Sequence, residues 1–593
     1  MITKALTKLT TLGQGAPKRA FLLILFSLLL CDLFLVRDIS WAIENMGGKR
    51  FWVNYVLSAL TLLLLMVLVL PGKNRIVRGL FIFFVLGTQI AQQSYFAIYH
   101  NFVTVFDLRF VAADPLLTLE LWIDNAIVLK PLILLAIELP LLLILFRLNL
   151  NPRIWVQASS SIIATLLFLL ISFSWYGIGK FQFSSIAYAG VFPSLIEHSN
   201  FSEKLADKPV LTARKAASDA PNIVFIIGES LTLEHLGIYG YERDTTPRLA
   251  KMMNNNELVL YRNAVTTGTR TLSSVPYMLT GLQGIDPQGL IYSSPTIFNY
   301  AKAAGYNTAF ITAQDFQWRN IDQIFIDKDL DYYRNGTDFS ASVSVSEGAD
   351  DIKVLETGVF PYLEKTLNSE QQEPMLLVVQ MNGSHYPYNT HSPDYIKKFL
   401  PEKKPNGLNA YDNTVLYTDL YLERLVEAVR AQYPEAWIFY SSDHGQSVSA
   451  NATFFNSGYS SGIIHNAMMA FPPASAFSQL QANKETPVSQ ADIFASILQL
   501  MKIKPVSEIN GESLLQPIDP DRLRVVSAYM KTLHNEPNAV LVFPDLTYIY
   551  LDFERNSITH RDGKTVGRFA DLPHEYREIF ERRLNPNNTT TTQ

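Results

Sequence analysis

Apolar residues are distributed unevenly along this chain of 593 residues. Before residue 180 they form long runs whose length and hydropathy predict five membrane spans. The predicted spans are Ala20 to Val36, Val53 to Leu70, Leu80 to Tyr99, Pro131 to Phe146 and Ile154 to Tyr176. After about residue 220 the sequence is that of an ordinary soluble globular domain. The pattern therefore predicts a membrane part followed by a soluble part.

The fourth predicted span is the weakest of the five. Lys130, Glu138 and Pro140 interrupt it, and a single segment of this kind would be typical of a buried core helix. Because its four neighbours have a similar apolar character, we expect all five segments to cross the membrane.

Basic residues in the short loops predict the orientation of these spans. They precede the first span, separate the second from the third and separate the fourth from the fifth: Lys4, Lys8, Lys18, Arg19, Lys73, Arg75, Arg78, Arg147 and Arg153. The loop from about 100 to 125 is acidic instead, with Asp107, Asp114, Glu120 and Asp124 against Arg109. The sequence thus predicts a multi-pass protein of a bacterial inner membrane whose soluble domain lies in the periplasm.

Composition sets the limits of each part. With 48% hydrophobic residues and a net charge of −5, the chain is too apolar to be disordered and too long for one domain. The single cysteine, Cys31, falls in the first span, so no disulfide is expected in the exported domain. Four parts are predicted: a transmembrane domain over 1–176, an interfacial connector and linker over 177–220, a catalytic domain over 221–580 and a disordered tail over 581–593.

Three apolar runs in the soluble part predict strands buried on both faces of a parallel sheet. They are Asn222 to Ile227, Met375 to Met381 and Trp437 to Tyr440. Helical patterns lie between them, such as "TVLYTDLYLERLVEAVRAQ". Alternating strands and helices of this kind predict a doubly wound α/β domain.

Chemically active side chains follow each of the three predicted strands. Glu229 follows the first strand, His385 the second, and Asp443 and His444 the third. Ligands bind at the carboxyl ends of strands in such sheets, where carboxylate and imidazole together suit zinc. A lone Asp-His pair is more often structural, but the ordered set favours a metal site. The hydroxyl-rich stretch "TTGTRTLSSVP", from Thr266 to Pro276, falls between the first two strand ends.

At these motifs the chain resembles a known family. "NIVFIIGESLTLEHLGIYGYERDTTPRLA", "TGTRTLSSVPYMLTG", "NGSHYPY", "NAYDNTVLYTDLYLERLVEAV" and "SSDHGQS" are similar to the successive motifs of membrane-bound phosphoethanolamine transferases, which belong to the alkaline phosphatase and sulfatase superfamily. The resemblance covers almost the whole chain. It implies a five-helix transmembrane bundle followed by a periplasmic, sulfatase-like, doubly wound α/β domain.

The resemblance also implies roles for individual residues. Metal ligation falls on Glu229, Asp443 and His444, together with Thr271, which matches the family's nucleophile. His385 and His465 lie near positions where family histidines hold the donor phosphate or a second metal. The implied ion is Zn²⁺, with Mn²⁺ as the alternative. Thr269 and Ser273 are the rival candidates for the nucleophile.

Several residues depart from the family's pattern. Thr267 and Tyr277 stand where the lipid A branch has a disulfide-bonded cysteine pair, so the loop is expected to be held by packing alone. Arg270 occupies a position that is usually small, and Gln446 replaces a common Glu. The stretch from 313 to 322 lacks an expected Cys-rich pattern.

The resemblance implies transfer of phosphoethanolamine from phosphatidylethanolamine to lipid A, lipopolysaccharide core or a glycan, through a phosphothreonine. The alternative is a phosphoglycerol transferase that uses phosphatidylglycerol. A sulfatase is disfavoured because no Cys or Ser stands in a C/S-x-P-x-R frame, and a catalytically silent scaffold remains the fourth candidate. The expected partners are the donor phospholipid, the acceptor and the membrane, and no nucleic acid.

The remaining polar residues are expected to be structural. His235, His391, His534, His560 and His574 are predicted to lie at the surface or to cap helices. Ser273 and Ser274 are expected to cap the helix after the hydroxyl-rich stretch. The segment from Tyr411 to Asn413 is expected to orient a helix beneath the site, and "SQADIFASILQLMKI" is predicted to be a core helix without chemistry.

Overall fold

The structure is a computed structural model. It describes residues 17–37, 39–46, 49–71, 74–99, 102–103, 129–147, 153–173, 181–191, 207–316, 321–340, 343, 348–368, 373–402, 407–448, 459–530, 537–560 and 565–585. The chain divides into two compact units, Met1–Phe201 and Ser202–Gln593. The acidic loop from 104 to 128 and the last residues of the predicted tail, 586–593, lie outside the described residues.

The first unit is helical. Its helices are α2 (Pro17–Cys31), α3 (Ile39–Met46), α4 (Lys49–Val69), α5 (Arg75–Tyr99), α8 (Leu129–Arg147), α9 (Ile154–Phe173) and α10 (Ser184–Ala189). A π-helical turn, Asp32–Val36, continues α2. By length and composition, four helical segments among the described residues could cross a membrane: Arg19–Val36, Phe51–Val69, Arg75–Phe96 and Ile154–Ser172.

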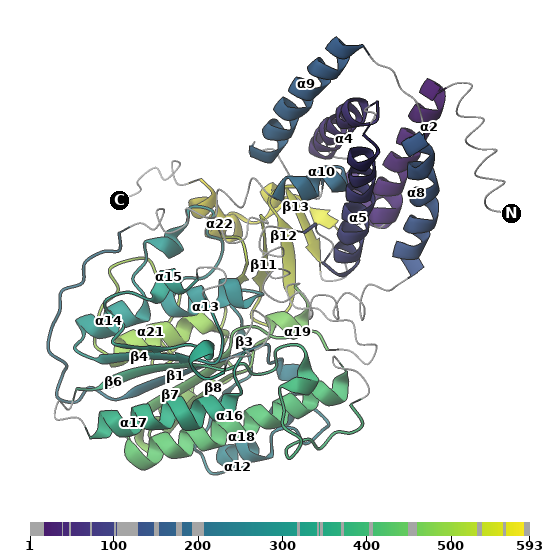
Figure 1. The fold of residues 1–593 in the computed structure, drawn as a ribbon. Helices are drawn as coiled ribbons and strands as arrows, with labels where there is room; N and C mark the ends of the chain where they lie inside the picture. The colour runs from purple at the N-terminus through teal and green to yellow at the C-terminus, as the bar shows by residue number, and fades with distance from the viewer. Residues whose placement is uncertain are drawn as a thin grey trace. The chain divides into compact units, whose positions relative to one another are not determined.

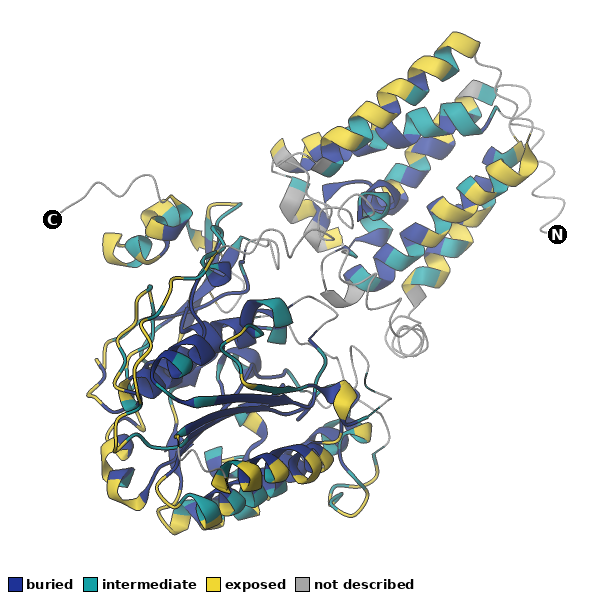
Figure 2. Cartoon of the chain, turned by 60° about the vertical axis from the view of Figure 1, so that its left-hand side comes forward, coloured by how far each residue is buried: buried dark blue, intermediate teal, exposed yellow. Residues whose placement is uncertain are grey.

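These four segments correspond to four of the five predicted spans. The remaining one, the fourth predicted span from Pro131 to Phe146, falls within α8. This helix carries Lys130, Glu138 and Arg147 and is not among the four segments. Exposed residues line the outer faces of the helices (Figure 2), and many are large and apolar, such as Leu23 and Phe83. An apolar exterior of this kind suits contact with lipid.

A buried ion pair closes one end of α2. Arg37 Nη1 lies 2.6 Å from Asp32 Oδ2, and both side chains are fully buried. Asp32 Oδ1 accepts a hydrogen bond of 2.9 Å from the backbone N–H of Ser184, while Arg37 donates to the carbonyl of Gln182. The pair therefore ties the end of the first helix to the start of α10 and to Gln182, which precedes it.

The second unit is built on a seven-stranded sheet. Its strands are β1 (Ile223–Gly228), β2 (Val259–Tyr261), β4 (Asn307–Thr312), β5 (Tyr332–Arg334), β6 (Met375–Gln380), β7 (Trp437–Ser442) and β8 (Met468–Phe471). The strand order is β2-β8-β7-β1-β6-β4-β5, and only β8 runs antiparallel to its neighbours. The three predicted strands form β1, β6 and β7, which are adjacent, parallel and buried along their whole length.

Helices cover both faces of this sheet (Figure 1), which confirms the predicted doubly wound domain. One layer contains α13, α14 and α21, and the other contains α12, α17 and α18. The helices of the unit are α12 (Pro247–Asn254), α13 (Thr271–Thr280), α14 (Ile297–Ala303), α15 (Asp322–Phe325), α16 (Asp351–Val354), α17 (Phe360–Leu367), α18 (Leu408–Gln432), α19 (Ser461–Ile464), α20 (Phe477–Gln481), α21 (Gln490–Leu500) and α22 (His574–Leu584).

A second, antiparallel sheet was not predicted from the sequence. Its order is β10-β11-β12-β13-β14, made of β10 (Arg524–Val526), β11 (Asn538–Val542), β12 (Tyr548–Asp552), β13 (Ser557–His560) and β14 (Thr565–Gly567). Phe580 of α22 joins Leu541 and Leu551 in the apolar cluster of this sheet. Two short strands, β3 (Ala264–Val265) and β9 (Val488–Ser489), pair separately near the loop that leads to Thr271.

Candidate metal centre and nucleophile

The central strand β1 and its neighbour β7 end side by side at the candidate site. Gly228 pairs in register with Ser442, so Glu229 and Asp443 leave the sheet at the same level. The backbone N–H of Asp443 donates to the carbonyl of Gly228 at 2.9 Å. A Cβ at Gly228 would collide with the phenol of Tyr440, so a glycine is required for this approach. The carboxyl ends of parallel strands thus deliver two acids to one point.

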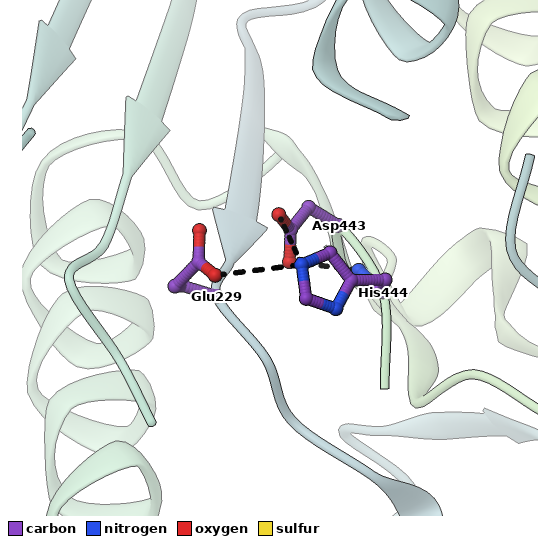
Figure 3. Close-up of side chains that lie close together, drawn as sticks. All are labelled: Glu229, Asp443 and His444. Carbon is purple, nitrogen blue, oxygen red and sulfur yellow. Dashed lines mark hydrogen bonds and ion pairs between the residues drawn. The ribbon is translucent and has the colours of Figure 1, made fainter. Parts of the chain in front are cut away.

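Glu229, Asp443 and His444 form one compact cluster (Figure 3). Each offers one ligand atom, and these atoms lie within 4.8 Å of one another. His444 Nε2 is 3.6 Å from Glu229 Oε1 and 3.4 Å from Asp443 Oδ2. All three side chains are buried. Two carboxylates and an imidazole at this spacing form a donor set that suits a divalent metal such as zinc.

Hydrogen bonds around the cluster leave the right atoms available. His444 Nδ1 lies 2.7 Å from the carbonyl of Gly445, so this nitrogen carries the proton and Nε2 keeps its lone pair toward the carboxylates. Asp443 Oδ1 accepts from the backbone N–H groups of Ser230 and His444. Among the described residues, Asp443 Oδ2 has no hydrogen-bond partner although it is buried. An orphaned carboxylate oxygen beside a free imidazole nitrogen fits a bound cation.

Electrostatics point the same way. Burial lowers the pKa of His444. Burial and the nearby Glu229 raise the pKa of Asp443 well above its usual range. Burial also acts to raise the pKa of Glu229, but His444, His385 and two side-chain hydrogen bonds outweigh it, and the net shift is downward. Two buried carboxyl groups this close cannot both ionise without a positive charge between them.

Thr271 completes the centre. Its Oγ1 donates a hydrogen bond of 3.0 Å to Glu229 Oε2, so the predicted nucleophile contacts the cluster directly. Thr271 is also the first residue of α13. The expectation that Ser273 and Ser274 cap this helix is wrong, because both lie in its first turn and Arg270 is the N-cap. The amide of Gln314, just after β4, donates to the same Glu229 oxygen at 2.8 Å.

Gln490 braces the Thr271 loop in the absence of a disulfide. Its Oε1 accepts from the backbone N–H and the hydroxyl of Thr267, both at 2.7 Å. Its Nε2 donates to the carbonyl of Asp443 at 2.7 Å and to that of Ser442. A single buried amide therefore joins the nucleophile loop to the metal loop. Tyr277, the other residue noted in place of a cysteine, donates instead to the carbonyl of Gly284.

The turn after Glu229 is held by α18. Ser230 has φ of +55°, a region that non-glycine residues seldom adopt. The hydroxyl of Tyr411 donates to the carbonyl of Ser230 and accepts from the N–H of Thr232. Asp412 contacts His235 Nδ1 at 2.7 Å and Arg243 at 2.8 Å. The segment from Tyr411 thus positions the turn, and His235 is a buried partner rather than the expected surface residue.

The other predicted histidines lie around the cluster without joining it. His385, half-buried after β6, contacts the carbonyl of Tyr386 through Nδ1 at 2.6 Å, and its charge contributes to the lowered pKa of Glu229. His465 lies on the segment that pairs with Val265, while its neighbour Asn466 pairs with Thr232. His391 is not a surface residue: both ring nitrogens are buried, and its ring centroid lies 6.2 Å from that of His385.

Sequence reasoning did not anticipate Gln314, Gln490 or His391. Gln314 follows the carboxyl end of β4, the same position by which Glu229 and Asp443 were predicted, so its place after a buried strand was an available signal. Gln490 is the first residue of α21, far along the chain from Thr271. Only its contacts in the folded structure give it a role.

Comparisons with known proteins found a matching family model and several similar sequences. Residues 221–503 match the family model named Sulfatase. Phosphoethanolamine transferase EptC of Escherichia coli (strain K12) is 28% identical over 261 residues, which cover 42% of this chain and 43% of that protein. Phosphoethanolamine transferase EptA of Helicobacter pylori (strain ATCC 700392 / 26695) is 27% identical over 292 residues, covering 46% and 52%. The chain therefore spans about half the length of these curated relatives.

One experimental structure extends the likeness to both units. It is the integral membrane protein lipooligosaccharide phosphoethanolamine transferase A (EptA) from Neisseria meningitidis, which superposes with a TM-score of 0.56 at 17% identity. The match covers 81% of this chain and 95% of that protein, so the two share a fold. The second unit thus contains a region that matches the Sulfatase family model, and in sequence the chain is similar to phosphoethanolamine transferases.

Proposed function

We propose that this chain is a metal-dependent transferase that moves phosphoethanolamine from phosphatidylethanolamine to an acceptor of the bacterial cell envelope. The observation that carries the proposal is the hydrogen bond of 3.0 Å between Thr271 Oγ1 and Glu229 Oε2, at the edge of a buried cluster with metal-ligand chemistry. The acceptor is lipid A, lipopolysaccharide core or a glycan. The similarity to named phosphoethanolamine transferases supports the transferred group.

Glu229, Asp443, His444 and Thr271 would hold the metal ion. When bound, a divalent cation such as Zn²⁺ favours the ionised form of a coordinated hydroxyl and polarises a phosphoryl oxygen. Mn²⁺ is the alternative ion. The donor set of carboxylates and imidazole nitrogen suits zinc better than an all-oxygen site would.

The side chains around Thr271 account for its activation. Its hydroxyl proton is directed at Glu229 Oε2, and the amide of Gln314 holds that oxygen in place from the other side. Attack by Thr271 Oγ1 on the donor phosphorus forms the phosphothreonine diester and breaks the bond to the diacylglycerol oxygen. An acceptor hydroxyl then attacks the same phosphorus and releases Thr271.

Protonation of the leaving groups falls to the neighbouring histidines. His385 acts on Glu229 electrostatically, and His465 lies on the segment between the nucleophile loop and the turn after Glu229. An imidazole in either place can hold the phosphate or give a proton to the diacylglycerol oxygen. The membrane unit keeps the catalytic domain at the surface of the bilayer that contains the donor. Its location in a bacterial inner membrane, with the domain in the periplasm, is part of the proposal.

The test is to purify the full chain and supply fluorescent phosphatidylethanolamine or phosphatidylglycerol in separate reactions. Diacylglycerol release from phosphatidylethanolamine by wild type, lowered about a thousandfold or more in Thr271→Ala, is the expected result. Ser273→Ala, which removes a hydroxyl from the same first turn, is the matched control and keeps its activity. Release from phosphatidylglycerol alone would support phosphoglycerol transfer instead, and release from neither lipid would contradict both.

A further inference from the structure

A positively charged side chain directly precedes Thr271. Arg270 is the N-cap of α13, yet its side chain makes no capping hydrogen bond. Its Nε is buried without a hydrogen-bond partner, and in the part of the chain that the structure describes the guanidinium forms no ion pair. Arg270 adjoins Thr271, whose hydroxyl contacts Glu229 Oε2 at 3.0 Å, so the chain places this arginine directly beside the candidate centre.

This position is unfavourable for the stability of the fold. The N-terminus of a helix carries partial positive charge, which stabilises anions and repels cations. The preferred N-cap residues are Ser, Thr, Asp and Asn, whose short side chains accept a hydrogen bond from the first turn. Arg270 offers neither benefit to α13. A buried, unpaired Nε adds a further cost. Folding therefore does not explain why an arginine stands here.

The charge balance of the centre suggests what the arginine is for. Two ionised carboxylates, those of Glu229 and Asp443, would neutralise a bound dication, and His444 as a metal ligand would be a neutral imidazole. A phosphodiester that enters this centre carries one negative charge, and the dication with its two carboxylates offers no net positive charge to balance it. The backbone N–H groups of Thr271 and Leu272 begin a helix of ten residues at the same place and favour an anion weakly.

We propose that Arg270 is a phosphate-binding residue that donates hydrogen bonds to a non-bridging oxygen of the transferred group. It binds the phosphodiester of the donor and then the phosphothreonine on the neighbouring residue. A planar guanidinium with several donors suits phosphate oxygens better than a point charge does. This inference rests on the proposed function for the identity of the ligand, but the binding chemistry is that of any phosphate anion at the centre.

The test measures inorganic phosphate binding to the zinc-loaded full chain by calorimetry in detergent. Zinc content is measured on the same samples, and affinity is expressed per zinc-loaded molecule. Arg270→Met should weaken phosphate binding roughly ten- to hundredfold, because a charge-assisted hydrogen bond is lost. Arg270→Lys keeps the charge but not the planar set of N–H donors, so its phosphate affinity should fall less than that of Arg270→Met. Arg262→Met is the matched control, since Arg262 is exposed and pairs with Glu485.

A second measurement separates phosphate binding from a structural role. Because Arg270 opposes the dipole of α13, Arg270→Met should melt at the same temperature as wild type or higher. A phosphate affinity of Arg270→Met within about twofold of wild type would overturn the proposal. So would a lower melting temperature of Arg270→Met together with an equal loss of phosphate affinity in Arg270→Lys. If wild type releases no diacylglycerol but Arg270→Met still loses phosphate affinity, the proposed function fails and the phosphate site stands.

Discussion

Two buried aspartates of this chain are satisfied in opposite ways. Asp32, in the membrane unit, faces the guanidinium of Arg37 at 2.6 Å through one oxygen and accepts a backbone N–H through the other. Asp443, in the catalytic unit, has backbone donors on one oxygen, no partner within the described residues on the other, and a second carboxyl group beside it. Burying a charge is costly unless it is paired. The first aspartate is paired within its own unit, whereas the cation proposed above would pair the second.

The largest expected effect comes from breaking the incomplete site. Asp443→Asn removes the orphaned oxygen's charge, so bound zinc should be lost and diacylglycerol release should fall about a thousandfold or more. The metal-free variant should be as stable as the metal-free wild type or more so, because the repulsion with Glu229 is relieved. Metal analysis, the release assay and thermal unfolding with a chelator present measure the three outcomes.

An opposite pattern would contradict this interpretation. If Asp443→Asn kept its zinc and lost stability in the metal-free state instead, Asp443 would be a structural group like Asp32. The orphaned oxygen would then have no functional meaning.

The next effect concerns the complete pair. Asp32→Asn removes the carboxylate that faces the buried Arg37, and breaking a buried ion pair from one side costs about 3–5 kcal/mol. The double variant Asp32→Asn/Arg37→Met should recover much of this loss, because it removes both charges. Thermal unfolding in detergent measures both variants. A double variant that is less stable than Asp32→Asn alone would show that Arg37 stabilises the unit through other contacts.

The contrast between these aspartates also explains what sequence alone could predict. Glu229, Asp443 and His444 were predicted together because each follows a strand whose apolar run is visible in the sequence, and parallel strands bring their ends to one edge. Asp32 lies inside an apolar helix, and no neighbouring sequence pattern indicated its partner. Its meaning depends on Arg37 and on a segment about 150 positions away, Gln182 and Ser184, which no local pattern connects to it.

Amide side chains were the hardest to predict. A glutamine in a sequence does not by itself indicate a catalytic or metal-binding role. The roles of Gln490 and Gln314 arise from long-range contacts to Thr267, Asp443 and Glu229. The C-terminal sheet was missed for a related reason, since its strands are short and pair only with one another. The expectation that packing alone holds the loop before Thr271 was wrong, because the side chain of Gln490 forms hydrogen bonds with Thr267 and with the carbonyl of Asp443.

That brace gives the third prediction. Gln490→Leu leaves the hydroxyl of Thr267 and the carbonyl of Asp443 without their amide partner, which should cost about 1–3 kcal/mol of stability. Misplacement of Thr271 should lower turnover roughly ten- to hundredfold while zinc content is unchanged. Gln479→Leu is the control, because the exposed Gln479 also donates its amide to a backbone carbonyl. Equal activity in both variants would show that the loop holds its shape without Gln490.

A third buried aspartate lies between the two extremes and gives the smallest effect. Among the described residues Asp351 has no cationic partner, but each of its oxygens accepts one backbone N–H, from Asn382 at 2.7 Å and from Gly383 at 2.9 Å. Burial, only partly offset by these bonds, raises the pKa of Asp351 from 3.8 to about 7. Folding therefore keeps a proton on this carboxyl that the unfolded chain releases above about pH 4. The stability it contributes is complete below that pH and is lost as the pH rises to about 7, with a slope of roughly 1.4 kcal/mol per pH unit.

The free energies of unfolding of wild type and Asp351→Asn, both measured with a chelator present, should differ by an amount that changes with this slope. A difference that stays constant from pH 4 to 7 would mean that two backbone N–H groups stabilise the ionised carboxylate as well as Arg37 stabilises Asp32.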